Sequence, residues 1–542
     1  MIPLAVVVLG SCALFLAAYF SYGRFLARHL GLDVSKKTPA VEMSDGVDYV
    51  PAKKGFLLGQ HFSAIAAAGP IVGPILGALY FGWLPALIWI VLGSIFFGAV
   101  HDFSSLAGSV RHRGVSIVEM MRHYLGRTGH ILFLVFVWLS LLYVITAFTD
   151  LTSSAFVDPE LGGGTASSSM MYLLLGVAMG LALVKLKMPL VWATSLFLVL
   201  VVASIVIGPV LPLRAPSGVT DPRMFWNTLL LGYCFIASLV PVWVLLQPRG
   251  YLGGFFLYGT LGMGLLGLLM GGESIQYPAF LGFVNEKGQS LFPILFVTVA
   301  CGACSGFHGI VCSGTTSKQV EKETDCHLVG YGGMLLEGVV AVLSLATVMI
   351  LVKSDGASLG SPDRIYAEGL SRFVSHLGIP VSFARSFALL AFATFIYDTL
   401  DVATRLARQL FQELVGWKGL LGRVLSTVIT LAVPFFCVSL QVLDSSGNRI
   451  PAWKVFWTIF GTSNQLLAAL TLMMLTLWLK KAGKKWLISA VPMVFMLTMT
   501  LWSLFTLLSS GLSSPPGAIA LVLLVIALLL LFQAVKTIRR TV

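Results

Sequence analysis

The chain has 542 residues, of which 57% are hydrophobic and only 11% are charged. Soluble domains carry about 25% charged residues, and a water-soluble fold of this composition would lack the polar surface to cover itself. Intrinsic disorder is excluded as well, because it requires low hydrophobicity and high charge. The composition therefore predicts an all-α polytopic membrane protein.

Basic residues outnumber acidic ones, with 35 Lys and Arg against 23 Asp and Glu, and the net charge is +12. In a membrane protein this excess follows from the enrichment of Lys and Arg in cytoplasmic loops. We therefore expect a lipid bilayer and no nucleic acid as partner. The seven cysteines lie mostly in apolar runs and predict no disulfide framework. We expect neither a metal site nor a resident cofactor.

A bilayer core needs about 20 apolar residues per helix, and the chain contains about fifteen such stretches, which we take as transmembrane helices. If the N-terminus lies outside and the C-terminus inside, most Lys and Arg residues, Arg249 among them, fall in cytoplasmic loops. The predicted spans are about 2–21, 56–80, 84–108, 130–150, 170–186, 190–212, 226–247, 251–271, 291–313, 330–352, 382–402, 424–440, 455–479, 486–509 and 516–535.

The second predicted span contains two Gly-Pro pairs, Gly69-Pro70 and Gly73-Pro74. A proline lacks an N–H and collides with the carbonyl four residues before it, so Pro70 frees the carbonyl of Ala66. Backbone carbonyls at bilayer depth need a partner, and broken helices near the midplane form the sites of many secondary transporters. The alternative interpretation is a proline kink with glycine-mediated helix packing.

Another proline, Pro241, lies inside the predicted span 226–247, shortly after Ser238. Counted from 56–80 as number one, this span is number six, and it runs in the opposite direction. An inverted five-plus-five repeat places its two discontinuous helices at one and six. The predicted divisions are a first helix with its loop (1–55), a transporter core (56–402, with halves 56–212 and 226–402) and C-terminal accessory helices (403–542).

The stretch 301–317 combines small residues with hydroxyl groups near the cytoplasmic half of its predicted helix. Together with the freed carbonyl of Ala66 it predicts a cation or proton site, with small-residue helix packing as the alternative. Further on, the adjacent amides Asn464 and Gln465 either join helices or line the path. The candidate side chains of the stretch are Ser305, His308, Ser313, Thr315 and Thr316.

Ionisable side chains inside the membrane are costly and indicate function. Glu337 lies close to the middle of its predicted span, and Asp102, preceded by His101, lies beyond the middle of another. We interpret both acids as proton carriers or ion ligands, or as members of buried structural hydrogen bonds. Asp401 and Arg405 are four residues apart on a helix, and this spacing predicts an interfacial salt bridge.

Several distinctive motifs follow one another along residues 1–480. They are Asp45-Gly46-Val47-Asp48-Tyr49-Val50-Pro51, Gly59-Gln60-His61-Phe62, Ala68-Gly69-Pro70-Ile71-Val72-Gly73-Pro74, Gly98-Ala99-Val100-His101-Asp102-Phe103, Leu245-Leu246-Gln247-Pro248-Arg249-Gly250-Tyr251-Leu252, Ser305-Gly306-Phe307-His308, Ser313-Gly314-Thr315-Thr316, Phe460-Gly461 and Asn464-Gln465. Together these motifs resemble those of the carbon starvation protein A (CstA) family. This resemblance implies a bacterial inner-membrane, multi-pass transporter of short peptides or pyruvate. It also implies a core of the amino acid–polyamine–organocation superfamily, with a five-plus-five inverted repeat.

These observations predict a secondary active importer without enzymatic activity, in which a small carboxylate-bearing solute binds between spans 56–80 and 226–247. The carboxylate is expected at the start of a half-helix, where the dipole favours an anion. A passive channel is the main alternative, and a membrane-embedded enzyme or sensor is a weaker one. The expected substrate-binding residues are His61, Gly69, Pro70, Ile71, Val72, Gly73, Ser238 and Pro241.

The predicted driving ion is H⁺ or Na⁺. A proton would be carried by Glu337 or Asp102. A sodium ion, as a hard cation, would bind oxygen ligands: the carbonyl of Ala66 with the hydroxyls of Ser313 and Thr316. The sequence predicts no obligate protein partner.

Overall fold

The computed structural model forms two compact units whose segments alternate along the chain. Unit 1 comprises Met1–Ser140, Ser274–Lys353 and Thr458–Val542, and unit 2 comprises Leu141–Glu273 and Ser354–Trp457. Residues 46–48, in the first of the motifs above, lie outside the part of the chain that the structure describes. That part consists of residues 3–45, 49–241, 243–354, 360–440, 442–443, 449–509, 511–512 and 514–541.

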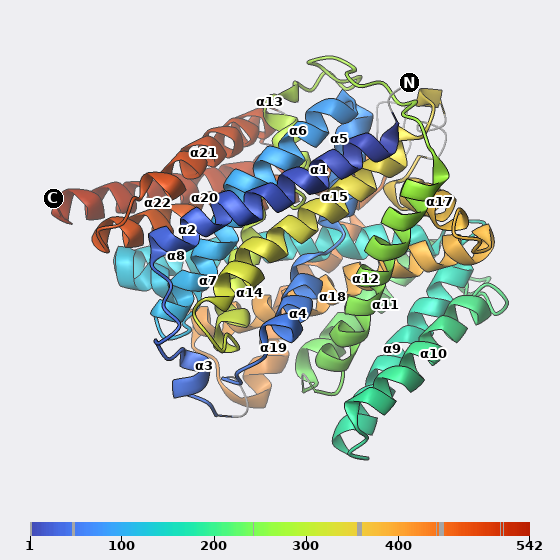
Figure 1. Cartoon of the computed structure of the whole chain (residues 1–542), viewed down its shortest axis with the longest axis horizontal. Coiled ribbons are helices and arrows are strands. Elements are labelled where there is room, and N and C mark those ends of the chain that lie inside the picture. Colours follow the sequence, from blue (N-terminus) through green and yellow to red (C-terminus); the bar gives the residue numbers. More distant parts are fainter. Residues whose placement is uncertain are drawn as a thin grey trace. The chain divides into compact units, whose positions relative to one another are not determined.

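Unit 1 is centred on α5 and α15, which pack along each other, with α1 and α6 beside them (Figure 1). Both central helices are rich in small and apolar residues, so they approach closely and bury nearly all of their surface. The helices of unit 1 are α1 (Leu4–Ala18), η1 (Tyr19–Gly23), α2 (Arg24–Leu30), α3 (Pro39–Glu42), α4 (Lys54–Ile65), α5 (Gly69–Phe81), α6 (Trp83–Gly93), η2 (Ser94–Gly98), α7 (Ala99–Arg111), the first part of α8 (Ile117–Phe156), α13 (Leu291–Thr298), α14 (Gly306–Gly314), η3 (Thr316–Lys318), η4 (His327–Gly332), α15 (Gly333–Met349), most of α20 (Ala452–Lys481), α21 (Leu487–Leu508) and α22 (Pro515–Thr541).

The predicted break in the second span is confirmed. The helix stops at Ile65 and restarts at Gly69, and the axes of α4 and α5 differ by 49°. Pro70 therefore lies in the first turn of α5, where a helix has no use for its missing N–H. The linking residues 66–68 are buried, so this non-helical backbone is enclosed by protein, as membrane depth requires.

A second break lies in the stretch that the sequence predicted as one continuous span, 291–313, and that prediction is wrong. Helix α13 ends at Thr298 and α14 begins at Gly306. Ser305 is extended, with φ −120° and ψ 126°, and two glycines, Gly302 and Gly306, flank it at close range. The result is a second helix pair in unit 1 interrupted by buried, irregular backbone.

Two π-helical turns precede the helices that bear the buried acids of unit 1. η2 leads into α7, and η4 leads into α15. Such turns are rare and occur frequently at functional sites. The start of both helices is therefore irregular close to Asp102 and Glu337.

Unit 2 contains the long helix α18 and a hairpin of α9 and α10, which lie side by side in Figure 1. Its apolar core includes Phe156, Trp226 and Tyr397, from α8, α11 and α18. The elements of unit 2 are the second part of α8, α9 (Gly162–Val184), α10 (Leu190–Ile207), α11 (Pro222–Leu239), α12 (Leu246–Gly271), α17 (Pro362–Ser375), α18 (Val381–Val415), α19 (Gly419–Ser439) and the paired strands β1 (Val442–Leu443) and β2 (Arg449–Ile450).

Within the described residues, 12 helices are long and apolar enough to cross a membrane, or up to 13 when the bent pair α4–α5 is one span. The difference from about fifteen arises at α11 and at the broken pair α13–α14. The predicted span 226–247 ends early, at Leu239, because Pro241 cannot continue the helix; Pro241 is exposed in the link to α12. The orientation and the inverted repeat stay predictions.

Candidate functional site

Four buried titratable side chains from three helices of unit 1 form a continuous chain. His101 Nδ1 lies 2.7 Å from Asp102 Oδ1, and Asp102 Oδ2 lies 2.8 Å from His308 Nδ1. On the other side of its ring, His308 Nε2 lies 3.1 Å from Glu337 Oε2. We call these four residues the imidazole cluster. The structure thus brings together Asp102, His308 and Glu337, which the sequence placed on three separate segments.

The contacts of His308 require a shared proton. A neutral imidazole carries a single N–H, whereas both ring nitrogens of His308 face carboxylates. The second contact is favourable only if one further proton resides on the ring or on Glu337. Imidazole is the side chain whose charge changes most readily near neutral pH. The cluster can therefore take up and release a proton with little rearrangement.

Glu337 is the least supported member of the cluster. Its side chain is 0% exposed, and neither of its oxygens accepts a well-directed hydrogen bond from the described residues. The contact with His308 is close, but the N–H is poorly aligned with the carboxylate. A buried carboxylate with so few donors is destabilised in its charged form. Its charge therefore depends on the protonation of His308.

His61 of α4 is buried near the cluster elements but belongs to another contact. Its Nδ1 lies 2.9 Å from Thr316 Oγ1, and its Nε2 lies 3.9 Å from Cys312 Sγ. These contacts join α4, which precedes the first break, to α14 and η3, which follow the second. His61, which was predicted to bind the substrate, thus contacts Thr316, which was predicted to bind the ion.

The second break is supported by two amides of α20. Asn464 Oδ1 accepts a hydrogen bond from the N–H of Phe307 at 2.9 Å, and its Nδ2 donates to Ser305 Oγ at 3.0 Å. Gln465 Nε2 donates to the carbonyl of Phe296 at 2.8 Å. Both amides therefore satisfy backbone groups that the break leaves unpaired, and they act as helix-joining groups.

The two breaks of unit 1 pack directly against each other. A methyl group at Gly69 would collide with Cys301, and a Cβ at Gly73 would lie 2.8 Å from the carbonyl oxygen of Thr298. The glycines of the two Gly-Pro pairs thus allow the two breaks to pack closely. Glycine-mediated packing was the alternative interpretation of this motif. At the start of α5, the N–H groups of Ile71 and Val72 both donate to the carbonyl of Ala68, so these donors are occupied in this conformation.

The remaining predicted ion ligands have protein partners. Ser313 donates to the carbonyl of Gly309 at 2.6 Å and accepts from the N–H of Ile117 at 2.8 Å. Thr315 is exposed and donates to the carbonyl of Val311. Among the described residues, neither hydroxyl forms a hydrogen bond with a member of the imidazole cluster. Ala66 lies at the end of α4, with its N–H bonded to Phe62.

A second charged group, in unit 2, was missed from the sequence. Arg249 was assigned to a cytoplasmic loop, and this assignment is wrong: it lies in α12, is 1% exposed, and contacts Asp398 and Asp401 of α18. The predicted Asp401–Arg405 salt bridge is also wrong. Arg405 instead donates to the carbonyls of Ala237 and Val240 at the end of α11, because these carbonyls have no helical N–H partner.

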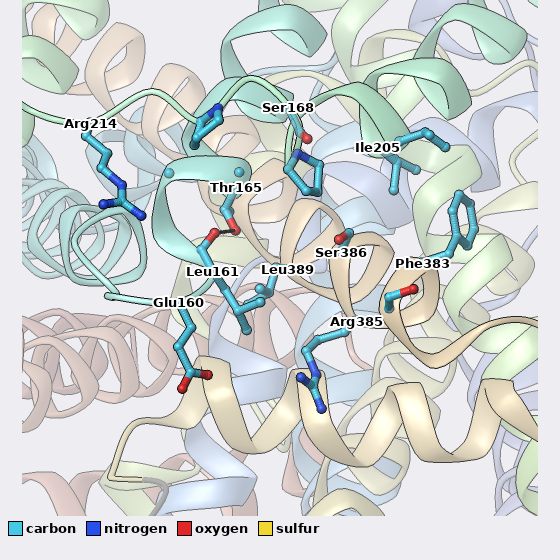
Figure 2. A pocket seen from close by; sticks show the side chains of 16 residues that line it. Glu160, Leu161, Thr165, Ser168, Ile205, Arg214, Phe383, Arg385, Ser386 and Leu389 are labelled. Carbon is cyan, nitrogen blue, oxygen red and sulfur yellow. Dashed lines mark hydrogen bonds between the residues drawn. The ribbon is translucent and has the colours of Figure 1, made fainter.

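Ser238 and Pro241 belong to unit 2. Ser238 is buried, and its Oγ lies 3.4 Å from Thr427 Oγ1 of α19. A surface pocket of about 390 Å³ lies elsewhere in unit 2, where the start of α9, the end of α10 and the start of α18 meet (Figure 2). Two of its charged side chains, Glu160 and Arg385, form ion pairs with residues of α17. The pocket thus has no array like the imidazole cluster.

The fold is that of a solved membrane transporter. The crystal structure of the Eremococcus coleocola manganese transporter, in complex with an aromatic bis-isothiourea substituted compound, matches with a TM-score of 0.52. It covers 94% of this chain and 100% of that chain, at 13% sequence identity. A mutant of the same transporter gives the same TM-score at 14% identity, covering 92% and 99%. At this identity the likeness shows the fold alone, a polytopic helical fold.

The sequence comparisons define the family. The family model described as carbon starvation protein CstA matches residues 4–365 and 357–503. The peptide transporter CstA of Helicobacter pylori is 33% identical over 559 residues, covering 92% of this chain and 81% of that protein. The pyruvate/proton symporter BtsT of Escherichia coli is 30% identical over 588 residues, covering 92% and 81%. The chain belongs to the CstA family.

Family membership confirms the resemblance drawn from the sequence motifs. Together with the apolar helices, it identifies a multi-pass transporter of the bacterial inner membrane. The relatives carry different names for their solutes: the Bacillus subtilis relative, 31% identical over 98% of this chain and 96% of its own length, is a peptide transporter CstA, whereas BtsT is a pyruvate/proton symporter.

Proposed function

We propose that the chain is a proton-coupled importer of a short peptide or of a small carboxylate such as pyruvate, with the imidazole cluster as its proton site. The observation that carries the proposal is His308, which lies between two buried carboxylates with both ring nitrogens in contact. Moving one proton on or off this array changes its charge inside the membrane. Such a change is what a coupling ion has to produce.

The geometry favours H⁺ over Na⁺. A hard cation needs several oxygen ligands, and the hydroxyls expected for it are engaged: Ser313 with backbone groups and Thr316 with His61. A proton needs a single acceptor atom, and Glu337 provides one. The name of the relative BtsT, a pyruvate/proton symporter, supports the same choice.

For the solute, we propose the start of α5 as the place of its carboxylate, because the dipole at a helix N-terminus favours an anion. We propose α13–α14 as the second discontinuous helix, in place of the span 226–247, because its break packs against that of α4–α5. The donors of Ile71 and Val72 are occupied and Gly69 is covered by Cys301. Solute binding therefore requires α13–α14 to withdraw from α5.

The test is solute uptake into proteoliposomes under imposed gradients. Pyruvate and a dipeptide are offered to the wild type with an inward proton gradient, with an inward sodium gradient, and with neither. We expect the proton gradient alone to accelerate uptake of one of the two solutes. Acceleration by sodium alone, or indifference to both gradients, would refute proton coupling.

The coupling residue is tested with Glu337→Gln, which is close in shape to the protonated acid. We expect the variant to exchange labelled for unlabelled solute but to lose the response to the proton gradient. Glu286→Gln is the matched control, because the Glu286 side chain is 91% exposed and lies outside the cluster. An unchanged gradient response in Glu337→Gln would remove Glu337 from the proton path.

A further inference from the structure

The surface pocket of unit 2, of about 390 Å³, lies where three long helices begin or end (Figure 2). Its lining comes from the starts of α9 and α18, the end of α10 and the segment 209–214 that follows α10. All three helices are long and apolar enough to cross a membrane. The ends of such helices lie in the headgroup region of a bilayer. The pocket therefore lies at the level of the phospholipid headgroups.

Two helix N-termini contribute backbone donors to the lining of this pocket. The N–H groups of Gly163 and Gly164 lie in the first turn of α9 and form no hydrogen bond with the described residues. The same holds for the N–H groups of Ser382 and Phe383 in the first turn of α18. The positive end of a helix dipole and its free N–H groups favour an anion. Two such ends in one pocket therefore favour a negatively charged ligand.

Arg214 and Arg385 add two positive charges to the lining. Arg385 pairs with Glu368 at 2.7 Å, although its Nε is buried and has no hydrogen-bond partner among the described residues. Glu160, the one acid among the described lining residues, is 71% exposed and pairs with Arg364. Arg214 is exposed and forms no ion pair with the described residues. Within the described part of the chain, the charge of Arg214 thus remains for a ligand.

The segment that carries Arg214 is fixed onto the start of α9. The N–H of Leu213 lies 3.0 Å from the carbonyl oxygen of Gly163 and 2.9 Å from Ser167 Oγ. The Ser167 hydroxyl in turn donates to the carbonyl of Leu211. A Cβ at Gly163 would lie 3.3 Å from Arg214 Cγ, so the arginine passes close over the glycine. These contacts hold the backbone of Arg214 beside the first turn of α9.

Apolar side chains complete the pocket on the side of α10. Ile205 and Phe383 lie at one side of the pocket and Arg214 at the other (Figure 2). Val206, which also lines the pocket, is 56% exposed, and the adjacent Ile207 is 41% exposed. An exposed apolar surface on a membrane-spanning helix faces lipid. A ligand in the pocket thus contacts a cationic group and the lipid-facing surface of α10 at the same time.

We propose that this pocket binds an anionic phospholipid, with the phosphate group at Arg214 and the two helix N-termini and the acyl chains along α10. Phosphate oxygens accept hydrogen bonds from guanidinium and backbone N–H groups, and basic pockets between membrane helices suit lipid headgroups. A soluble anion would leave the apolar side of the pocket uncovered. A zwitterionic lipid carries in addition a cation, which Arg214 repels.

The test is native mass spectrometry of the purified full-length protein in detergent, titrated with phosphatidylglycerol or with phosphatidylcholine of the same acyl chains. We expect the first phosphatidylglycerol to bind more tightly than the first phosphatidylcholine. Arg214→Gln should weaken phosphatidylglycerol binding about fivefold, the share of one basic side chain at a membrane surface. Because Arg214 is exposed, this variant is expected to keep its fold.

A second variant, Ser386→Leu, fills the pocket without changing its charge. Ser386 lines the pocket and is half-buried. We expect this variant to weaken phosphatidylglycerol binding as well, which attraction to surface charge alone would not do. Arg127→Gln is the matched control, because Arg127 is an exposed arginine of α8 outside the pocket. Its lipid binding is expected to equal that of the wild type.

Four results would overturn the proposal. They are equal affinities of the wild type for the two lipids, unchanged phosphatidylglycerol binding in both pocket variants, an equal loss in Arg127→Gln, and displacement of the bound lipid by glycerol phosphate or pyruvate at the same concentration. The last result would show that the pocket takes a soluble anion. None of these readouts depends on transport, so the outcome is separate from that of the proposed function.

Discussion

The imidazole cluster of unit 1 and the group of Arg249, Asp398 and Asp401 in unit 2 are built alike and differ in the central side chain. In each, one nitrogen side chain lies between two buried carboxylates: His308 between Asp102 and Glu337, and Arg249 between Asp398 and Asp401. An imidazole exchanges its proton near neutral pH, whereas a guanidinium does not. The first cluster can change charge at its centre, and the second can do so only at its carboxyl groups.

The difference extends to the backbone that supports the two groups. His308 lies two residues into α14, directly after a break, and depends on Asn464 for its position. Arg249 lies in the first turn of α12, after the link from α11, whereas its two aspartates lie well inside the continuous helix α18. The carboxylates of the two groups therefore differ in support: those of Arg249 share one uninterrupted helix, and those of His308 lie on two helices that each follow a π-helical turn.

The largest effect is expected from Arg249→Gln. Removing the guanidinium that contacts both Asp398 and Asp401 leaves two buried carboxylates together, and breaking a buried ion pair in this way costs about 3–5 kcal/mol. The double variant Arg249→Gln with Asp401→Asn removes one negative charge as well, and we expect it to recover part of the stability. Thermal unfolding in detergent measures both. Equal losses in the single and the double variant would show that the charge excess has no role.

A somewhat smaller and pH-dependent effect is expected from His308→Gln. The variant leaves Asp102 and Glu337 without the imidazole between them, and protonation of either carboxyl removes one of the two buried negative charges. Relative to the wild type, the melting temperature should therefore rise as the pH falls and drop as the pH rises. Arg249→Gln with Asp401→Asn is the comparison, because its remaining cluster carries a single acid. A deficit of His308→Gln that is the same at every pH would contradict the shared proton.

Asn464→Ala tests the dependence of the imidazole cluster on its break. The variant leaves the buried N–H of Phe307 without an acceptor, which costs about 1–3 kcal/mol. We expect a comparable loss of stability, and a larger fractional loss of proton-driven uptake than of solute exchange. Equal fractional losses of uptake and of exchange would show that proton coupling does not depend on this break.

The smallest effect is expected at the glycines. Gly73→Ala places a Cβ 2.8 Å from the carbonyl of Thr298, and overpacking of this kind costs about 1–3 kcal/mol, reduced by the better helix propensity of alanine. At Gly232 of α11 a Cβ meets nothing within 4 Å, so Gly232→Ala should stabilise by about 0.5–1 kcal/mol. Thermal unfolding compares the two, and equal shifts would show that the breaks pack loosely.

The local signals in the sequence predicted the class, the family and the first break. Two Gly-Pro pairs four residues apart are a local signal, and so is an acid such as Glu337 inside an apolar run. The second break has no proline at its centre, and small residues such as Gly302 and Ser305 fit a packed helix as well as a broken one. For this reason the sequence analysis placed the second break at Pro241, whereas in the structure the helix ends just before that residue.

The partners of the buried charges were beyond the reach of the sequence, because they depend on which helices meet. Arg249 follows Pro248 closely and resembles a loop residue, since proline often marks a helix start. Only the packing of α12 against α18 shows that it pairs with Asp398 and Asp401. One signal was available: Thr394, Asp398, Asp401 and Arg405 recur every three or four residues, which places polar groups along one face of a helix.

The π-helical turns η2 and η4 have a consequence for the acids that follow them. Each such turn holds one residue more than an α-helical turn, so every later side chain is rotated about 100° around the axis relative to an uninterrupted helix. Deleting a single residue from 94–98 would turn the Asp102 side chain away from His308. The deletion would remove none of the titratable side chains of the imidazole cluster. The directions of the two acidic side chains therefore depend on the extra residue in the π-helical turn before each of them. If such a turn moved along its helix, the acid would point in another direction while the span stayed helical.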